Sequence, residues 1–401
     1  IRIGELEENI NLNKGDKILL NSGKSFIGNK NGIHINYKQF PKDVKTGDKV
    51  LIDDGKYAFE VIGTNNKDKT TLKALNKVCL KSRKGVNLPK TKISTPSLTT
   101  KDMKNVKFAI SLEVDWIALS FVRHGKDLIE LRKIIEKYSD VKIPIIAKIE
   151  KPEALDNIDD IIKNSDGIMV ARGDLGIEIP SQEVPLIQKK LVHLSKKARI
   201  PVIIATQMME SMIENLQPTR AEVNDVANSV MDGADAVMLS AETSIGKYPS
   251  AVVSQISKII NSVEYSDQIV VPADPPTIKT DRYITKFVCY HAAKTANEIN
   301  ASSITTMTYS GYTGFQLSSW RPHCNILVFT SNKRILCRLS LLWGVKAFYY
   351  NKQVSTDKTI EHINKILTKS GYAKKGDMVI NLAAMPVKSR GMVNTLRISE
   401  I

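Results

Sequence analysis

Short apolar runs alternate with amphipathic stretches between about residues 111 and 262. Each run is followed by a polar or glycine-containing turn and then by apolar residues at helical spacing. The runs are residues 116–119, 143–147, 167–170, 201–205 and 236–239. Near-continuous apolar strands are typical of a parallel sheet that is covered on both faces. The pattern therefore predicts βα repetition.

Two of the intervening helices have clear signals. Residues 127–138 carry apolar positions at i, i+3 and i+4, and residues 219–231 follow Pro218, a residue favoured at the start of a helix. An α/β barrel and an open Rossmann-like sheet are both built from such units. No GxGxxG motif follows any of the predicted strands, which favours the barrel.

The flanking regions have other patterns. Residues 3–93 contain short alternating stretches and the turn pairs Asn31-Gly32 and Asp54-Gly55, which predicts a small all-β domain. Residues 269–280 contain prolines and are interpreted as a linker. A further α/β region follows, with predicted helices at 286–298 and 313–320 and predicted strands at 304–307, 326–329, 345–349 and 378–382.

Composition narrows the class of protein. A chain of 401 residues with 42% hydrophobic content can bury more than one core, and it has no long uncharged apolar run, so a membrane span is not expected. The four cysteines are far apart and form no CxxC pair, which indicates reduced thiols inside a cell. The net charge of +16 is spread over scattered lysines and forms no basic block. A basic RNA-binding surface is therefore a weaker explanation of this charge than a generally lysine-rich composition.

Polar side chains follow the predicted strands, and in a barrel such side chains meet at one mouth. They are Ser120 and Arg123, Lys148 and Glu150, Arg172 and Asp174, Thr206 and Gln207, and Ser240 and Glu242. Glu150 and Asp174 offer the oxygen ligands that Mg²⁺ prefers. A simple ion pair of each carboxylate with Lys148 or Arg172 explains the spacing equally well.

Other residues suit anion chemistry, each with a plainer alternative. Lys148 shares a strand face with Glu150 and can neutralise charge in phosphoryl transfer, or form only an ion pair. The turn with Gly173 and Gly176 lets backbone N–H groups approach an anion, or is merely tight. Thr206 can donate a hydrogen bond or a proton, although an isolated threonine is more often structural. The basic loop 81–89 suits phosphate oxygens or is only solvated.

Taken together, these strings resemble pyruvate kinase over nearly the whole chain and in that family's order. The matching strings are VLIDDG, KGVNLP, SFVR, AKIE, DGIMVARGDLGIEIP, ATQMMESM, PTRAEVNDVANSVMDGADAVMLSAET and NTLRI. The resemblance implies a TIM-type (β/α)8 barrel, partial in this sequence, with an inserted β lid and a C-terminal α/β regulatory domain. The implied domain limits are 1–2 and 94–268 for the barrel, 3–93 for the lid and 269–401 for the C-terminal domain.

The resemblance also implies chemistry: Mg²⁺-dependent phosphoryl transfer from phosphoenolpyruvate to ADP, giving pyruvate and ATP in the last step of glycolysis. Mn²⁺ is a substitute metal, K⁺ a second cofactor, and a homotetramer without nucleic-acid or membrane partners the expected state. The implied roles are as follows: Lys148 and Thr206 catalytic, Glu150 and Asp174 metal ligands, Lys148, Gly173, Asp174 and Thr206 substrate contacts, and Arg2 and Lys84 nucleotide contacts.

Some departures from the family pattern shape the expectations. Residues 1–4 look like the end of the third barrel strand, so we expect the sequence to be partial, with the K⁺ ligands upstream. The expected place is the cytoplasm, with a plastid-type organelle as alternative. Thr308, Ser310, Gly311, Thr313 and the loop 386–391 fall where relatives bind a sugar-phosphate effector, but Tyr309 and Tyr312 replace residues that are often basic or polar there. A catalytically silent binding relative is the alternative function.

Overall fold

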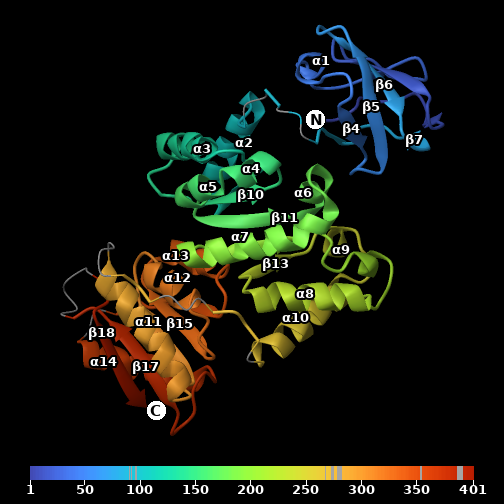
Figure 1. Ribbon diagram of the computed structural model, residues 1–401. Coiled ribbons are helices and arrows are strands. Elements are labelled where there is room, and N and C mark those ends of the chain that lie inside the picture. Colours follow the sequence, from blue (N-terminus) through green and yellow to red (C-terminus); the bar gives the residue numbers. More distant parts are fainter. Residues whose placement is uncertain are drawn as a thin grey trace.

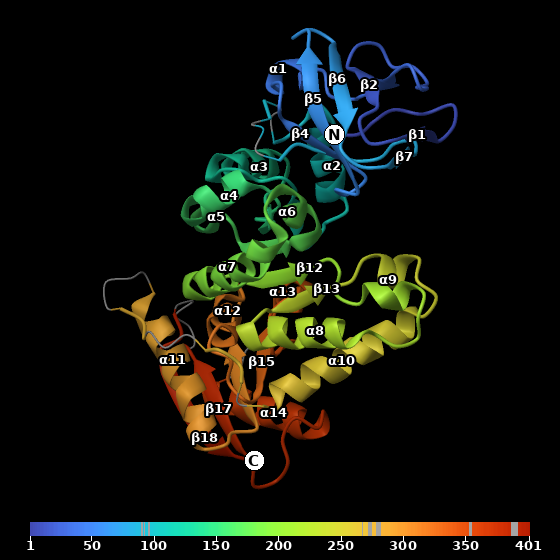
Figure 2. The same ribbon diagram turned by 45° about the vertical axis from the view of Figure 1, so that its right-hand side comes forward.

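The computed structural model describes residues 1–89, 91, 93–94, 97–266, 268–271, 275–277, 282–352, 355–385 and 392–401. In this part of the chain the strands form four sheets, one of them a two-stranded pair. Figures 1 and 2 show three bodies in a row, with the N-terminal β domain at one end, a helix-covered parallel sheet in the middle and the C-terminal domain at the other end.

The middle body contains a five-stranded parallel sheet in the order β13-β12-β11-β10-β9. Its strands are β9 (Ile117–Leu119), β10 (Ile145–Ile149), β11 (Gly167–Ala171), β12 (Val202–Ala205) and β13 (Ala236–Met238). All five predicted strands are present, and the barrel assignment of the fold is confirmed. β10 begins two residues later than predicted. Pro144 has no N–H for the ladder, so the regular strand starts after it and Lys148 lies inside the strand.

Helices cover this sheet. They are α2 (Thr100–Ser111), α3 (Gly125–Tyr138), α4 (Pro152–Asp156), α5 (Ile158–Asn164), α6 (Arg172–Glu178), α7 (Val184–Ala198), α8 (Arg220–Asp232), α9 (Ala241–Ser244) and α10 (Pro249–Glu264), with 3-10 turns at Ser181–Glu183 and Glu210–Ile213. Local sequence explains several ends. Thr99 and Asp102 form a capping box at α2, Thr219 and Glu222 form one at α8, and Gly233 ends α8 at a φ of 99°.

The N-terminal body is a small β domain, as predicted. Its main sheet has six strands in the order β3-β2-β6-β5-β4-β8, and β1 pairs with β7. The elements are β1 (Ile10–Leu12), β2 (Lys17–Asn21), β3 (Ile33–His34), α1 (Phe40–Asp43), β4 (Lys49–Ile52), β5 (Tyr57–Thr64), β6 (Lys69–Ala74), β7 (Val78–Leu80) and β8 (Val86–Asn87). Asp53, Asp54 and Gly55 all have positive φ and turn β4 into β5, which matches the Asp-Gly turn signal.

The C-terminal body has a second five-stranded sheet, in the order β16-β15-β14-β17-β18. Its elements are α11 (Tyr283–Glu298), β14 (Ser303–Met307), α12 (Tyr312–Ser318), β15 (Asn325–Thr330), α13 (Lys333–Leu339), β16 (Val345–Tyr349), α14 (Thr356–Lys369), β17 (Met378–Ala383) and β18 (Thr395–Glu400). The sequence reading missed α13, α14 and β18. β18 is an edge strand without a buried residue, antiparallel to β17, and it lacks the apolar run that marks a buried strand.

Two further sequence predictions meet the limits of the description. The predicted linker 269–280 lies partly outside the described residues, and its described positions carry no helix or strand. The loop 386–391 lies wholly outside them. Among the described residues, no helix has both the length and the apolar character needed to cross a membrane.

Candidate active site

The ends of four neighbouring strands bring the predicted side chains to one edge of the barrel sheet. Ala147 pairs with Leu119, Lys148 with Met169, and Ala171 with Ala205. The residues that follow these pairs therefore lie next to one another at the carboxyl end of the sheet. This edge faces the β domain, whose turn between β4 and β5 lies close to α6 (Figure 2).

Lys148 and Glu150 form an ion pair at this edge. The Lys148 Nζ lies 2.5 Å from Glu150 Oε1 and donates a hydrogen bond of 3.0 Å to Ser120 Oγ. The other carboxylate oxygen of Glu150 accepts a 2.6 Å hydrogen bond from the backbone N–H of Phe121. The Glu150 side chain is only 1% exposed, whereas that of Lys148 is 24% exposed. The carboxylate is thus fixed and buried, and the ammonium reaches the open side.

Burial raises the pKa of the Glu150 carboxyl. The ion pair with Lys148 and the N–H of Phe121 oppose that rise, and the negative charge of Asp174 adds to it. The pKa of Glu150 stays above its ordinary value on balance. A carboxylate whose pKa is raised by a second carboxylate nearby is well placed to share a cation with it.

α6 begins directly after β11 and places Gly173 and Asp174 in its first turn. The Gly173 N–H donates a 2.7 Å hydrogen bond to Thr206 Oγ1, which itself donates to the carbonyl of Ala205 at 2.6 Å. A Cβ on Gly173 would lie 3.3 Å from Thr206 Oγ1, so glycine permits this close approach. Gly173 and Thr206 are therefore in contact, as the prediction of one common site requires.

Three residues at this edge, Phe121, Thr206 and Gln207, have a positive φ, and that of Gln207 is 54°. Thr206 has a φ of 72° and Phe121 a φ of 55°, and neither is a glycine. A β-branched residue in this region costs of order 1–3 kcal/mol, and such strain is concentrated at functional sites. The strain places the Thr206 hydroxyl against Gly173 and the Phe121 N–H against Glu150.

The two carboxylates differ in their ion pairs. Glu150 pairs with Lys148, in agreement with the plainer alternative from the sequence. Arg172, in contrast, pairs with Asp225 of α8 at 2.7 Å and donates to the carbonyl of Thr206 at 2.7 Å. No ion pair of Asp174 is found among the described residues. Asp174 therefore remains available to a cation in the site.

The donor set fits Mg²⁺. Within the described ranges there is no group of three or more His, Cys, Asp or Glu residues that could hold a metal by themselves. Mg²⁺ does not need one, because it usually takes one or two protein carboxylates and completes its shell with water and substrate phosphate. Glu150 and Asp174 provide that number of carboxylates, with Lys148 beside them.

The β domain brings the two predicted nucleotide contacts together. Arg2 forms a backbone bridge with Gly85, and the N–H of Ile3 donates to the carbonyl of Lys84 at 3.0 Å. The Lys84 Nζ pairs with Asp53 Oδ1 at 2.7 Å, and this hydrogen bond raises the pKa of Lys84. Sequence reasoning gave Asp53 no role, although it lies in the VLIDDG string.

The candidate effector residues lie at the start of α12. The N–H of Gly311 donates to Thr308 Oγ1 at 3.1 Å, the N–H of Tyr312 donates to Ser310 Oγ at 3.4 Å, and the side chain of Thr313 is buried. The neighbouring loop 386–391 lies outside the described residues. The hydroxyls of Thr308 and Ser310 therefore accept hydrogen bonds within the turn that leads into α12.

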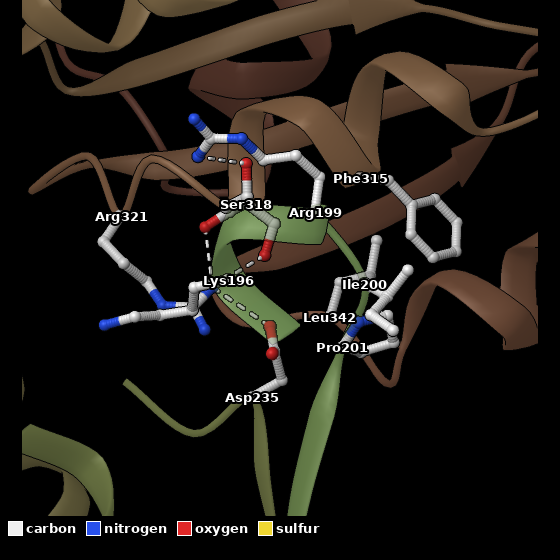
Figure 3. Close-up of a pocket in the computed structure, with 10 residues that line it drawn as sticks. Lys196, Arg199, Ile200, Pro201, Asp235, Phe315, Ser318, Arg321 and Leu342 are labelled. Atoms are coloured by element: carbon white, nitrogen blue, oxygen red, sulfur yellow. Dashed lines mark hydrogen bonds and ion pairs between the residues drawn. The ribbon is translucent and has the colours of Figure 1, made fainter. Parts of the chain in front are cut away.

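A small pocket lies at the opposite edge of the barrel sheet, against the C-terminal domain (Figure 3). Arg321 of the C-terminal domain pairs there with Asp235 at 3.0 Å and donates to the carbonyl of Gly233 at 2.7 Å. Burial, followed by the charge of Arg321, lowers the pKa of the neighbouring Lys196 to about 8. None of the predicted site residues lines this pocket, which belongs to the junction between the two bodies.

Comparisons with known proteins agree on one family. The family model described as pyruvate kinase, barrel domain, matches residues 1–253, and the one described as pyruvate kinase, alpha/beta domain, matches residues 286–399. A pyruvate kinase of Mycobacterium intracellulare is 39% identical over 93% of this chain and 78% of its own length. One of Geobacillus stearothermophilus is 38% identical over 98% of this chain and 67% of its own length. The crystal structure of a pyruvate kinase from Cryptosporidium parvum matches with a TM-score of 0.88 at 34% identity, covering 100% of this chain and 81% of that one.

Proposed function

The chain belongs to the pyruvate kinase family and is a phosphotransferase, and from this premise we propose that the edge formed by β9 to β12 is its phosphoryl-transfer centre. The family's substrates are phosphoenolpyruvate and ADP, and its enzymes need Mg²⁺ and K⁺. The observation that carries the proposal is the convergence of Lys148, Glu150, Gly173 and Thr206 on one edge of the sheet.

Glu150 and Asp174 are the proposed ligands of Mg²⁺, for which Mn²⁺ can substitute. When bound, the metal neutralises charge on the phosphoryl oxygens and fixes their position. Burial and a backbone hydrogen bond hold Glu150 in place. Such preorganisation is the main contribution of a protein to phosphoryl transfer, which requires little covalent work from side chains.

Lys148 is the proposed charge-neutralising residue for the transferring phosphoryl group. Its ammonium is held between Glu150 and Ser120 Oγ and is partly open to solvent. With Glu150 serving as a metal ligand, the Lys148 ammonium would be free to turn towards a phosphoryl oxygen. The Lys148–Glu150 ion pair thus keeps a lysine charge in the site between turnovers.

Gly173 and Thr206 are the proposed contacts for the enolpyruvate part of the substrate. Their mutual hydrogen bond places an N–H and a hydroxyl side by side. The Thr206 hydroxyl donates to the carbonyl of Ala205, so it must rotate to donate a hydrogen bond or a proton to the substrate. The strained φ of Thr206 keeps the hydroxyl within reach of the Gly173 N–H and the Ala205 carbonyl.

Arg2 and Lys84 are the proposed contacts for the nucleotide phosphates, and the β domain acts as a lid. Arg2 bridges Gly85, the residue after Lys84, and Asp53 orients the Lys84 ammonium. A closed lid excludes water that would otherwise intercept the phosphoryl group.

Several finer points stay proposals that rest on the family. They are the domain limits 1–2 with 94–268, 3–93 and 269–401, a homotetrameric state, a cytoplasmic location, K⁺ dependence and an effector site at Thr308, Ser310, Gly311 and Thr313. A titration of the protein with phosphorylated sugars would test the effector site, since binding should be lost in Thr308→Ala.

The competing function is a silent relative that binds phosphoenolpyruvate or nucleotide without turnover. Pyruvate formation from phosphoenolpyruvate, ADP and Mg²⁺ separates the two. We expect turnover that disappears in Lys148→Met. Binding of phosphoenolpyruvate without any pyruvate formed would favour the silent relative.

A further inference from the structure

A buried ion pair joins the segment after β10 to α6, next to the proposed metal ligands. Lys151 follows Glu150 directly, and its Nζ lies 2.6 Å from Oε1 of Glu178, the last residue of α6. The side chains are 8% and 2% exposed, so both charges are removed from water. Sequence reasoning assigned no role to either residue.

The Lys151–Glu178 pair and the proposed metal ligands each link the segment after β10 to α6. Glu150 and Lys151 are the two residues that follow β10. Asp174 and Glu178 lie four residues apart and therefore on one face of α6. The cation would join Glu150 to Asp174 near the start of α6. The Lys151–Glu178 pair joins the same two elements at the other end of that helix.

The lid contacts the same end of α6. The side-chain amide of Asn87, in β8, donates a 3.3 Å hydrogen bond to Glu178 Oε1. A methyl group on Gly55 would lie 3.6 Å from Cγ2 of Ile177, so the β4–β5 turn rests on α6. That turn also carries Asp53, the partner of Lys84. The proposed nucleotide contact and the proposed metal site thus meet at α6.

A purely stabilising role explains this pair poorly. The other oxygen of Glu178, Oε2, is buried and has no hydrogen-bond partner among the described residues. Removing two charges from water costs about as much as their attraction returns, and apolar residues of similar volume are often at least as stable in such places. The pair therefore points to a positioning role.

We propose that Lys151 and Glu178 are positioning residues that hold Glu150 and Asp174 at the spacing a divalent cation needs, and that Asn87 couples this spacing to the docking of the lid. The inference rests on the proposed metal site. It adds a link between the metal half and the nucleotide half of the centre that the family assignment does not supply.

Binding of Mn²⁺ alone, followed by electron paramagnetic resonance without substrates, tests the positioning role. The variant Lys151→Met with Glu178→Leu removes both charges at similar volume, so it should fold and unfold at a temperature no lower than the unchanged chain. We expect its Mn²⁺ affinity to fall about 10-fold or more, as for other residues that orient metal ligands. Glu178→Gln alone should show a loss in the same direction.

The matched control is Asp166→Asn, which breaks another largely buried pair at the opposite end of β10. It should leave Mn²⁺ affinity within twofold. Unchanged Mn²⁺ affinity in the double variant would overturn the inference. Unchanged affinity in Glu150→Gln would instead overturn the proposed metal site, so the two failures are distinguishable.

Asn87→Ala tests the coupling to the lid. We expect the KM for ADP to rise about threefold or more because lid docking loses one hydrogen bond, while the KM for phosphoenolpyruvate stays within twofold. The lid variant Asn76→Ala, which removes hydrogen bonds within the β domain, is the control and should leave both constants unchanged. An unchanged KM for ADP in Asn87→Ala, or an equal rise in both constants, would overturn the coupling.

Discussion

The two ends of the barrel sheet treat a buried carboxylate in opposite ways. At the carboxyl end, burial raises the pKa of Glu150, and Lys148 only partly compensates. At the amino end, burial alone would raise the pKa of Asp166 as well. There, hydrogen bonds from Arg132 and the N–H of Ile145 outweigh burial, so the pKa of Asp166 falls below its ordinary value.

This difference separates function from stability. Asp166 is fully engaged, with Arg132 at 2.7 Å and Lys142 at 3.1 Å, and it also accepts a hydrogen bond from the N–H of Ile145, the first residue of β10. Glu150 is left short of positive charge, and two residues at the same end of the sheet, Phe121 and Thr206, have strained backbones. Carboxyl ends of barrel strands carry catalytic groups and amino ends carry stability, and here the contrast is between two charged side chains of the same sheet.

The largest effect is expected for Lys148→Met at the carboxyl end. Loss of the ammonium removes the charge that compensates the transferring phosphoryl group, so turnover should fall about 10³-fold or more. The far-ultraviolet circular dichroism should stay that of the unchanged chain. Steady-state pyruvate formation provides the measurement. Near-normal turnover would remove Lys148, and with it this end of the sheet, from the mechanism.

Glu150→Gln should raise the Mg²⁺ concentration for half-maximal activity by about 10- to 100-fold, because a neutral amide is a poor ligand for a hard cation. In the unchanged chain, protons compete with Mg²⁺ for Glu150, whose pKa is raised. Metal affinity should therefore fall as pH falls towards that pKa, and this dependence should flatten in the variant. Activation curves at several pH values test both points, and identical curves for the two proteins would refute the ligand role.

Asp166→Asn should lower stability and leave turnover unchanged, the reverse of what is expected for Lys148→Met. Loss of the partly buried ion pairs should lower the free energy of unfolding by about 2 kcal/mol, while turnover at 25 °C stays within twofold. The pKa of Asp166 is lowered on folding, so its contribution is present above the unfolded pKa of about 3.9 and is lost as pH falls through the folded value. Urea unfolding at neutral and acid pH measures this contribution. If the variant were as stable as the unchanged chain at pH 7, Asp166 would not stabilise the amino end of the sheet, and the contrast between the two ends would fail.

The smallest effect is expected for Lys142→Met at the amino end. Lys142 is 70% exposed, and an exposed ion pair contributes about 0–1 kcal/mol. Both stability and turnover should stay close to those of the unchanged chain, which makes this variant the charge-matched control for Lys148→Met. A large loss of turnover would show that net charge, rather than position at the carboxyl end, controls activity.

Sequence alone predicted the strands and the residues at their ends, because buried parallel strands leave long apolar runs and the polar residues after them are conspicuous. It could not supply partners from distant elements. Nothing near Arg172 in the sequence identifies Asp225 as its partner, and nothing near Lys151 identifies Glu178. The positive φ of Thr206 was also beyond prediction, since a β-branched residue normally avoids that conformation.

The central claim is that Glu150 and Asp174 hold the divalent cation of a phosphoryl-transfer centre. Anomalous scattering from a crystal of the protein grown with Mn²⁺ tests it most directly. The account predicts one strong peak between the two carboxylates, with the Lys148 ammonium displaced from Glu150. A peak elsewhere, or none with Lys148 still paired to Glu150, would contradict it.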